Sequence, residues 1–349
     1  MSAIIIVLLF VCAQGMKIAS PEEFQKDYII PSRTNCIKGF FVLMVFISHF
    51  RSYVTLTPAD NIAVTIVAYL GQLMVAPFLF YSGYGVMESI KRKGLSYVKS
   101  IPVHRALKTL LHFDIAVLLF LIVRSALGVK YSLQHILLAF TTWTSLGNSN
   151  WYILVIISSY LISAVSSFVF KRSHYLAAVS VTLLSILLSH TLSLYQPGYW
   201  YNTILCYSLG VWYSILREKM EKIVMQNDIL YCAAMAFAFM AYHWLSGRTG
   251  KSTWIYQIYA LFFVILVVGV TMKISYCNAF LDFLGSHIFS IYILQRIPMM
   301  ILNWKGIYKN DNTSFFLLSF VLTCILALAY DFCMNKLDGL IFAKPQKCL

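Results

Sequence analysis

Ten apolar stretches, each close to 20 residues long, follow one another along almost the whole chain. A helix of about 20 residues crosses the roughly 30 Å hydrocarbon core of a bilayer and satisfies its own backbone hydrogen bonds there. The sequence therefore predicts an all-α integral membrane protein with about ten transmembrane helices. The stretches are residues 37–57, 62–87, 106–128, 150–170, 174–194, 199–216, 228–246, 254–273, 283–303 and 314–334.

Two further apolar segments are unsuited to spanning. Residues 3–13 are too short, which favours a short membrane-associated helix, or a true start at Met16, over a cleaved signal peptide. Residues 132–147 are short and contain Gln134 and His135, so we expect a re-entrant or interfacial segment. We expect one polytopic domain over residues 1–349, divided into an apolar segment and cytoplasmic lead-in (1–35), a helical bundle (36–336) and a cytoplasmic tail (337–349).

Composition and charge narrow the class of protein. With 60% hydrophobic and only 11% charged residues, the chain lacks the roughly 25% charged residues of a soluble domain. This excludes a soluble enzyme, a secreted disulfide scaffold and a disordered protein. If the first span starts in the cytoplasm, 19 of the 27 Lys and Arg residues fall on the inside and 7 on the outside. The net charge of +14 is then mainly a topology signal that puts both termini in the cytoplasm.

The eight cysteines show no Cys-x-x-Cys pair and no spacing typical of a metal site. Most of them lie in apolar segments. We therefore expect reduced, structural cysteines and no bound metal.

Ionisable residues inside spans are costly and mark candidate functional sites. Lys38 and His49 are 11 residues apart, so on one helix they face the same way about 16 Å apart. A ligand could then place an anionic head at Lys38 and its reacting end at His49, whose neutral imidazole can accept a proton. The alternative is that His49 only bonds a neighbouring helix.

Polar features also flank other spans. Arg105 and Lys108 share a helix face after Pro102, which fits a phosphate clamp or a topology signal alone. The stretch from Phe80 to Gly85 carries two glycines and Ser82, which favour close helix packing.

Near the outer surface, Asn150 and Trp151 open the fourth predicted span, where an aromatic belt is the simpler interpretation. Arg296 lies within a span and needs a carboxylate, a carbonyl cluster or a polar cavity. Asp331 lies near a span end, where we expect its carboxylate to reach the interface.

In combination these features resemble the membrane acyltransferase-3 family, the bacterial O-acyltransferases of surface polysaccharides. The resemblance covers about residues 35–340. It rests on the order and spacing of Lys38-x10-His49, Phe80-Tyr81-Ser82-Gly83-Tyr84, Arg105-x-x-Lys108, Trp151-Tyr152-Ile153-Leu154, Tyr207-x-x-Gly210 and Gly285-x4-Ser290-x-Tyr292.

The resemblance implies transfer of an acyl group, most simply acetyl, from cytoplasmic acetyl-CoA to a hydroxyl of a surface glycan or its lipid-linked precursor. It implies a bacterial inner-membrane protein with no metal and no nucleic-acid partner. His49 would act as general base or acyl relay, and Arg296 would stabilise the oxyanion. Lys38, which we also count among the catalytic candidates, would bind the coenzyme with Ser82, Arg105 and Lys108. The acceptor would lie against Arg51, Asn150, Trp151 and Tyr292.

The sequence departs from the family pattern at three positions. Gln295 stands where the last segment of relatives usually has His, and Lys replaces Arg at positions 38 and 108. Lysine keeps the charge but loses bidentate geometry. The competing interpretation is a transporter or flippase for a polysaccharide or lipid-linked substrate, although the sequence shows no convincing inverted repeat.

Overall fold

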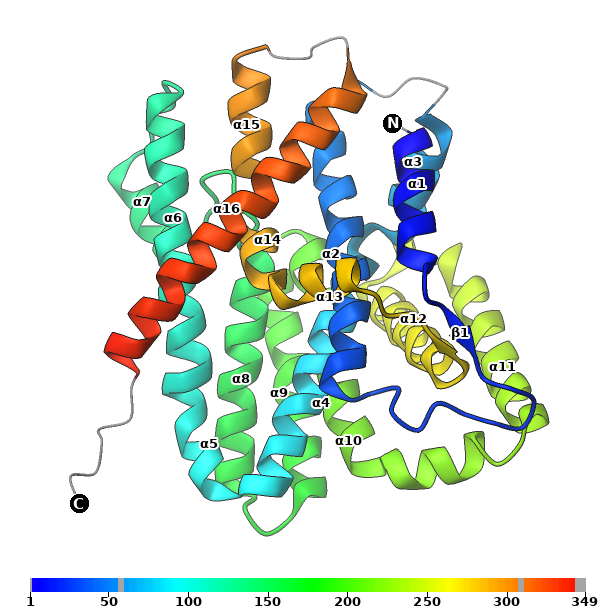
Figure 1. Cartoon of the computed structure of the whole chain (residues 1–349). Helices are drawn as coiled ribbons and strands as arrows, with labels where there is room; N and C mark the ends of the chain where they lie inside the picture. Colours follow the sequence, from blue (N-terminus) through cyan, green and yellow to red (C-terminus); the bar gives the residue numbers. More distant parts are fainter. Residues whose placement is uncertain (1, 56–59, 307–310, 343–349) are drawn as a thin grey trace, which may run out of the picture.

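The computed structural model describes residues 2–55, 60–306 and 311–342 (Figure 1). The α-helices are α1 (Ser2–Ala13), α2 (Pro31–Phe50), α3 (Asn61–Leu70), α4 (Ala76–Lys93), α5 (Leu95–Ile101), α6 (Lys108–Ala126), α7 (Leu133–Phe140), α8 (Trp151–Val169), α9 (His174–Ser193), α10 (Leu205–Val224), α11 (Asp228–Ser246), α12 (Thr253–Lys273), α13 (Ala279–Ser286), α14 (Ile288–Leu294), α15 (Arg296–Trp304) and α16 (Asn312–Ile341). Shorter elements are β1 (Lys17–Ile18), β2 (Ile274–Ser275), the 3-10 turns η1 (Arg51–Tyr53), η3 (Gly71–Val75), η5 (Gly198–Trp200) and η6 (Thr249–Lys251), and the π-helical segment η4 (Pro102–Leu107).

The prediction of an all-α membrane protein is confirmed. Eight helices of the described residues are long and apolar enough to cross a bilayer, and α1 and residues Ile288–Trp304 form shorter apolar helices. Two predicted spans are absent from the eight. The second half of α10 is charged, and the stretch predicted at 283–303 is broken into α13, α14 and α15. The stretch predicted at 62–87 divides at Gly71, where φ is +42°, so α3 is a separate helix.

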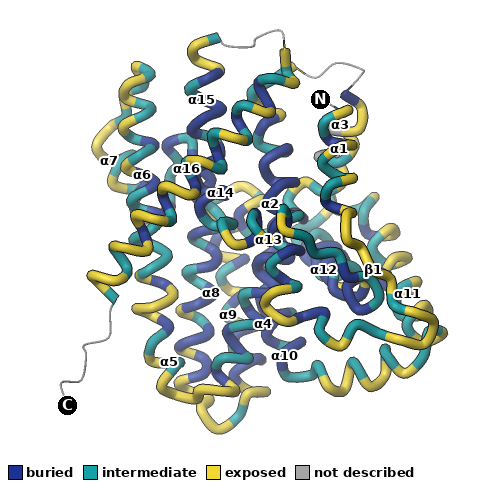
Figure 2. The backbone as a smooth tube through the Cα atoms, viewed as in Figure 1, coloured by how far each residue is buried: buried dark blue, intermediate teal, exposed yellow. Residues whose placement is uncertain are grey.

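The burial pattern matches a bundle surrounded by lipid. Buried positions concentrate on α2, α4, α8 and α12, while α11 and much of α16 are exposed (Figure 2). Exposed side chains on the outer helices are often large and apolar, such as Leu183 and Phe237. In a membrane these side chains contact lipid tails rather than water, so their exposure costs little.

Two helix crossings depend on glycines. A Cβ at Gly83 of α4 would lie 2.1 Å from the carbonyl oxygen of Tyr207, and one at Gly210 of α10 would lie 2.0 Å from that of Phe80. The α2–α13 crossing is built in the same way, with Gly39 against Leu281 and Gly285 against Asn35. Because small residues let backbones approach closely, these crossings fix α2 and α4 in the centre of the bundle.

One end of the bundle carries the basic clusters of the sequence. Figure 1 shows the ends of α4, α8 and α10 at the same end, where Lys91–Lys93 and Lys171–Arg172 are exposed. The segment predicted to be re-entrant forms the short helix α7, which packs on α6 near the opposite end. It is followed by an irregular loop that leads into α8.

The position of the N-terminal helix does not follow the expectation that both termini lie on the cytoplasmic side. Helix α1 begins at the end of the bundle opposite the basic clusters, because its apolar surface packs on α3 and α13 (Figure 1). The chain then reaches the basic end through β1, which pairs antiparallel with β2. Residues 343–349 of the predicted cytoplasmic tail lie outside the described residues.

The expectation that every cysteine is reduced is wrong for one pair. Cys36 of α2 and Cys277 form a disulfide with their Cα atoms 5.3 Å apart. They are separated by 241 residues in sequence, and only the α2–α13 crossing brings them together. Local spacing cannot reveal such a pair.

Candidate functional site: a basic cavity and a buried histidine

A cavity of about 530 Å³ opens at the basic end of the bundle, between α2, α4, η4, α8 and α10. The lining residues Ile30, Pro31 and Arg92 are exposed, which shows that the cavity opens at this end. Four basic side chains and one carboxylate line the cavity. These charged residues are Lys38, Arg92, Arg105, Arg217 and Glu88.

Not all of these charges are free to meet a ligand. Arg217 donates to Glu221 at 2.7 Å and to the Tyr84 hydroxyl at 3.0 Å. Glu88 accepts from Lys91 and from Ser214, both at 2.7 Å. In the described part of the chain, Lys38, Arg92 and Arg105 form no ion pair, so they supply the cavity's uncompensated positive charge.

Lys38 owes its position to the start of α2. Pro31 stands in the first turn of this helix, where its fixed φ is favourable and its missing N–H costs nothing. The helix then continues without a break to Phe50, so it carries both Lys38 and His49, as the spacing predicts.

Arg105 reaches the cavity through the π-helical turn of η4. Residues Leu95–Ala126 form one continuous apolar helix, and its α-helical hydrogen bonding is interrupted at Pro102, which has no N–H. The Arg105 guanidinium donates from Nε to the Tyr97 hydroxyl at 3.2 Å.

Lys108 does not join Arg105 at the cavity. Its ammonium lies 2.7 Å from Asp338 of α16, and it is not among the cavity-lining residues. Arg105 and Lys108 share a face only if the chain between them turns as in an α-helix. The wider π-helical turn of η4 changes the angle about the helix axis between two residues that are three positions apart.

Ser82 and three tyrosines form the inner part of the cavity. Ser82 lies near Tyr152 and Tyr160 of α8. The cavity also contacts Tyr81 and Tyr84, and the Tyr81 hydroxyl is buried with no hydrogen-bond partner among the described residues. Tyr81, Tyr84 and Tyr152 belong to the sequence motifs quoted above, but the sequence indicates no role for them or for Tyr160, because such tyrosines are indistinguishable from aromatic packing residues.

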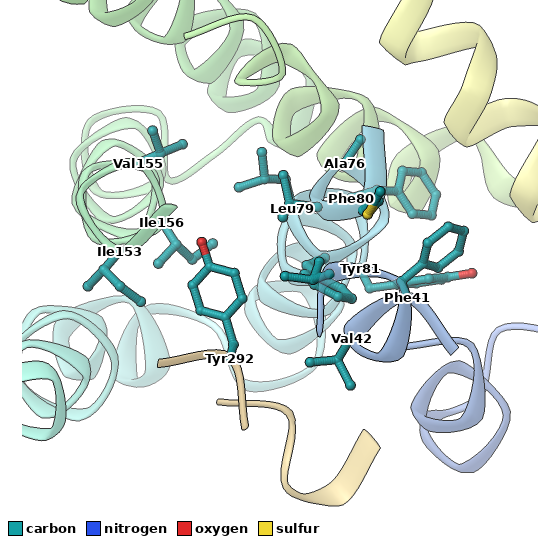
Figure 3. Packing of buried hydrophobic residues seen from close by; sticks show 14 of the residues in the cluster. Phe41, Val42, Ala76, Leu79, Phe80, Tyr81, Ile153, Val155, Ile156 and Tyr292 are labelled. Carbon is teal, nitrogen blue, oxygen red and sulfur yellow. The ribbon is translucent and has the colours of Figure 1, made fainter. Parts of the chain in front are cut away.

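His49 lies deeper and is not among the residues that line this cavity. Between Lys38 and His49, α2 is buried in apolar packing. Figure 3 shows Val42, Tyr81 and Ile156 converging in this region, with the Tyr292 ring beside them. Several of the predicted residues therefore gather in two places, one around Lys38 and one around His49.

His49 is half-buried at the end of α2. Its Nε2 lies 3.4 Å from the Ser149 hydroxyl. Its Nδ1 is buried and has no hydrogen-bond partner among the described residues, so one nitrogen of the ring is unsatisfied.

The loop before α8 brings Ser149 to His49. Asn148 accepts from the Leu146 amide at 2.9 Å, and Asn150 donates to the Thr142 carbonyl oxygen at 2.6 Å. Asn150 is buried, and its amide holds this loop in place. The role of Ser149, 100 residues from His49, has no signal in the sequence.

Breaks between α13, α14 and α15 place two more predicted residues beside His49. The Tyr292 ring centroid lies 6.4 Å from that of His49 and 5.4 Å from that of Tyr152. The Arg296 charge is near enough to act electrostatically on His49 and Tyr292. Gln295, which occupies the position of the family histidine, is buried and donates to the Tyr292 carbonyl oxygen at 3.0 Å.

Trp151 and Arg51 are placed elsewhere. The Trp151 ring packs against Tyr199 at 6.2 Å, and Arg51 is exposed in η1. No contact of either side chain with His49 is found in the described part of the chain.

The expectation that Asp331 simply reaches the interface is wrong. Its carboxylate bonds both His287 and Ser290 of the segment around α14, so it fastens α16 to the broken helix. The His112 Nε2 similarly lies 2.9 Å from Asp338. No group of three or more His, Cys, Asp and Glu side chains in the described residues is arranged to hold a metal ion.

Comparison with known proteins shows the family of the chain. The family model described as an acyltransferase domain, acyltransferase 3, matches residues 33–331. No curated protein and no solved structure matches the chain. The match covers most of the chain and includes α2, the basic cavity and the surroundings of His49, so this protein belongs to the acyltransferase-3 family of membrane acyltransferases.

Proposed function

We propose that the protein transfers an acyl group, most simply acetyl, from cytoplasmic acyl-CoA to a hydroxyl of a surface glycan or its lipid-linked precursor. The observation that carries this proposal is the pairing, along α2, of a basic cavity open at one end of the bundle with a half-buried histidine whose Nδ1 has no hydrogen-bond partner among the described residues. We place the protein in a bacterial inner membrane with the basic end in the cytoplasm.

The coenzyme occupies the basic cavity in this proposal. Its phosphates meet Lys38 and Arg105, which lack carboxylate partners in the described residues, and its pantetheine arm extends past Ser82 toward His49. Charge-assisted hydrogen bonds to phosphate favour this orientation. Lys108 does not bind the coenzyme in this proposal, because it forms an ion pair with Asp338.

At the reacting end, His49 accepts the proton of the acceptor hydroxyl while the hydroxyl oxygen attacks the thioester carbonyl carbon. The carbon–sulfur bond then breaks, and the coenzyme thiolate leaves and takes up the proton. Arg296 and the Tyr292 hydroxyl, which has no partner among the described residues, stabilise the oxyanion. In the relay version, His49 first becomes acylated and then gives the acyl group to the acceptor.

Arg105→Gln is expected to raise the KM for acyl-CoA about tenfold with little change in kcat, because one charge-assisted phosphate contact is lost. Lys99→Gln is the matched control, since it removes one positive charge from the exposed surface of α5. The measurement is transfer of radiolabelled acetyl in inverted membrane vesicles at varied acetyl-CoA concentration. An equal KM for Arg105→Gln and the wild type contradicts the placement of the coenzyme in this cavity.

The same assay distinguishes a transporter or flippase. A transporter moves its substrate without consuming acetyl-CoA. Release of free coenzyme A that depends on both the protein and an acceptor therefore supports the acyltransferase. Substrate movement with no acetyl-CoA consumed contradicts it.

A further inference from the structure

Two arginines lie on elements that meet beyond His49, at the end of α2 away from the basic cavity. Arg124 lies in the last turn of α6, and Arg296 begins α15. Helix α15 contacts both α6 and η1, which carries Tyr53. The Arg124 Nη1 lies 3.9 Å from the sulfur of Met300, which follows Arg296 by one turn of α15, so Arg124 lies against the helix that carries Arg296.

The donors of these arginines are mostly unused. Arg124 donates from Nε to the Tyr131 hydroxyl at 3.0 Å and makes only a weak contact, 3.9 Å long, with the Met300 sulfur. The Nε of Arg296 is buried and has no hydrogen-bond partner in the described part of the chain. A guanidinium has five N–H donors, so several remain available on each side chain.

Neither arginine forms an ion pair with a carboxylate among the described residues, although both are half-buried. A cation within a membrane protein ordinarily pairs with an opposite charge or faces a polar space. A planar guanidinium is well suited to a carboxylate or a phosphate. Arg124 does not simply extend to the surface, because its guanidinium turns inward to Tyr131 and Met300.

We propose that Arg124 and Arg296, where α6 meets α15, form an anion-binding site that holds a phosphate or carboxylate group of the acceptor. This inference deepens the proposed function and, for the acceptor's identity, rests on it. An anion bound there places a neighbouring hydroxyl of the same molecule at His49, on the side opposite the coenzyme. Arg124 is a positioning residue in this arrangement, because it contacts the acceptor away from the reacting atoms.

Three amphiphiles test the site without knowledge of the natural acceptor. Octyl glucuronide carries a sugar and a carboxylate, octyl phosphate carries a phosphate without a sugar, and octyl glucoside is a neutral sugar. Binding to the purified protein in detergent is measured as thermal stabilisation, which needs no acyl transfer. We expect stabilisation by one or both anionic compounds at concentrations at which octyl glucoside has no effect. The responding compound identifies a sugar carboxylate or a lipid phosphate as the better ligand.

Arg124→Gln is expected to weaken anion binding about tenfold, and Arg124→Lys is expected to restore part of it, because the charge returns without the forked geometry. Lys130→Gln, which removes an exposed charge just beyond α6, is expected to bind as the wild type does. All variants are first compared by size-exclusion chromatography to establish folding. Where octyl glucuronide also serves as acceptor for labelled acetyl, Arg124→Gln raises its KM and leaves the KM for acetyl-CoA unchanged.

The outcomes separate this inference from the proposed function. Equal stabilisation by charged and neutral compounds, or undiminished anion binding by Arg124→Gln, overturns the anion site. Anion binding that depends on Arg124 but occurs without acetyl transfer to any acceptor supports the site and contradicts the acyltransferase mechanism.

Discussion

His49→Ala is expected to lower acyl transfer about a hundredfold to ten-thousandfold, the range that a positioned general base contributes. The substitution removes the imidazole whose Nδ1 is free and whose Nε2 lies 3.4 Å from Ser149. It leaves the basic cavity intact, so the KM for acyl-CoA is expected to change little. The measurement is transfer of radiolabelled acetyl from acetyl-CoA in inverted vesicles, at matched amounts of protein.

His190→Ala is the matched control, because His190 is an exposed histidine on α9 and contacts neither site. Labelled acetyl that stays on the wild-type protein without acceptor, but not on His49→Ala, supports the acyl-His relay. Its absence from both, together with lost transfer in His49→Ala, supports the direct general-base step. Full activity of His49→Ala contradicts both versions of the mechanism.

The fold was largely predictable because spans and their packing residues are encoded locally. The α2 stretch is long and apolar, which predicts a helix that carries Lys38 and His49 on one side. Gly83 lies in a segment whose small residues indicate close packing, and the structure pairs its helix with that of Gly210. The length of an apolar stretch does not reveal whether short turns break it into several helices, as they do between α13 and α15.

The relative positions of site residues could be predicted only where a single unbroken helix carries them, as α2 carries Lys38 and His49. Arg105 and Lys108 separate because Pro102 introduces a π turn, which helical spacing does not reveal. Ser149 meets His49, and Cys36 meets Cys277, through contacts between segments 100 and 241 residues apart. Such contacts depend on helix crossings, and periodicity within one segment contains no information about them.

Gly83→Ala is expected to destabilise the protein by about 1–3 kcal/mol, the usual cost of forcing extra volume into a packed contact. The new Cβ would lie 2.1 Å from the Tyr207 carbonyl oxygen, so α4 and α10 would have to separate. Gly85→Ala is the matched control on the same helix, because nothing lies within 4 Å of a Cβ there. Its effect is expected to be neutral or slightly stabilising, since alanine favours helix more than glycine does.

The measurement is the fraction of monodisperse protein that remains after heating in detergent, followed by size-exclusion chromatography. Gly210→Ala is expected to match Gly83→Ala, because its Cβ would lie 2.0 Å from the Phe80 carbonyl oxygen in the same crossing. Once one alanine has separated the helices, the second meets a relaxed contact, so the double variant should lose less stability than the sum of the two single losses. Strictly additive losses, or equal stability of Gly83→Ala and Gly85→Ala, would show that α4 and α10 do not cross at these two glycines.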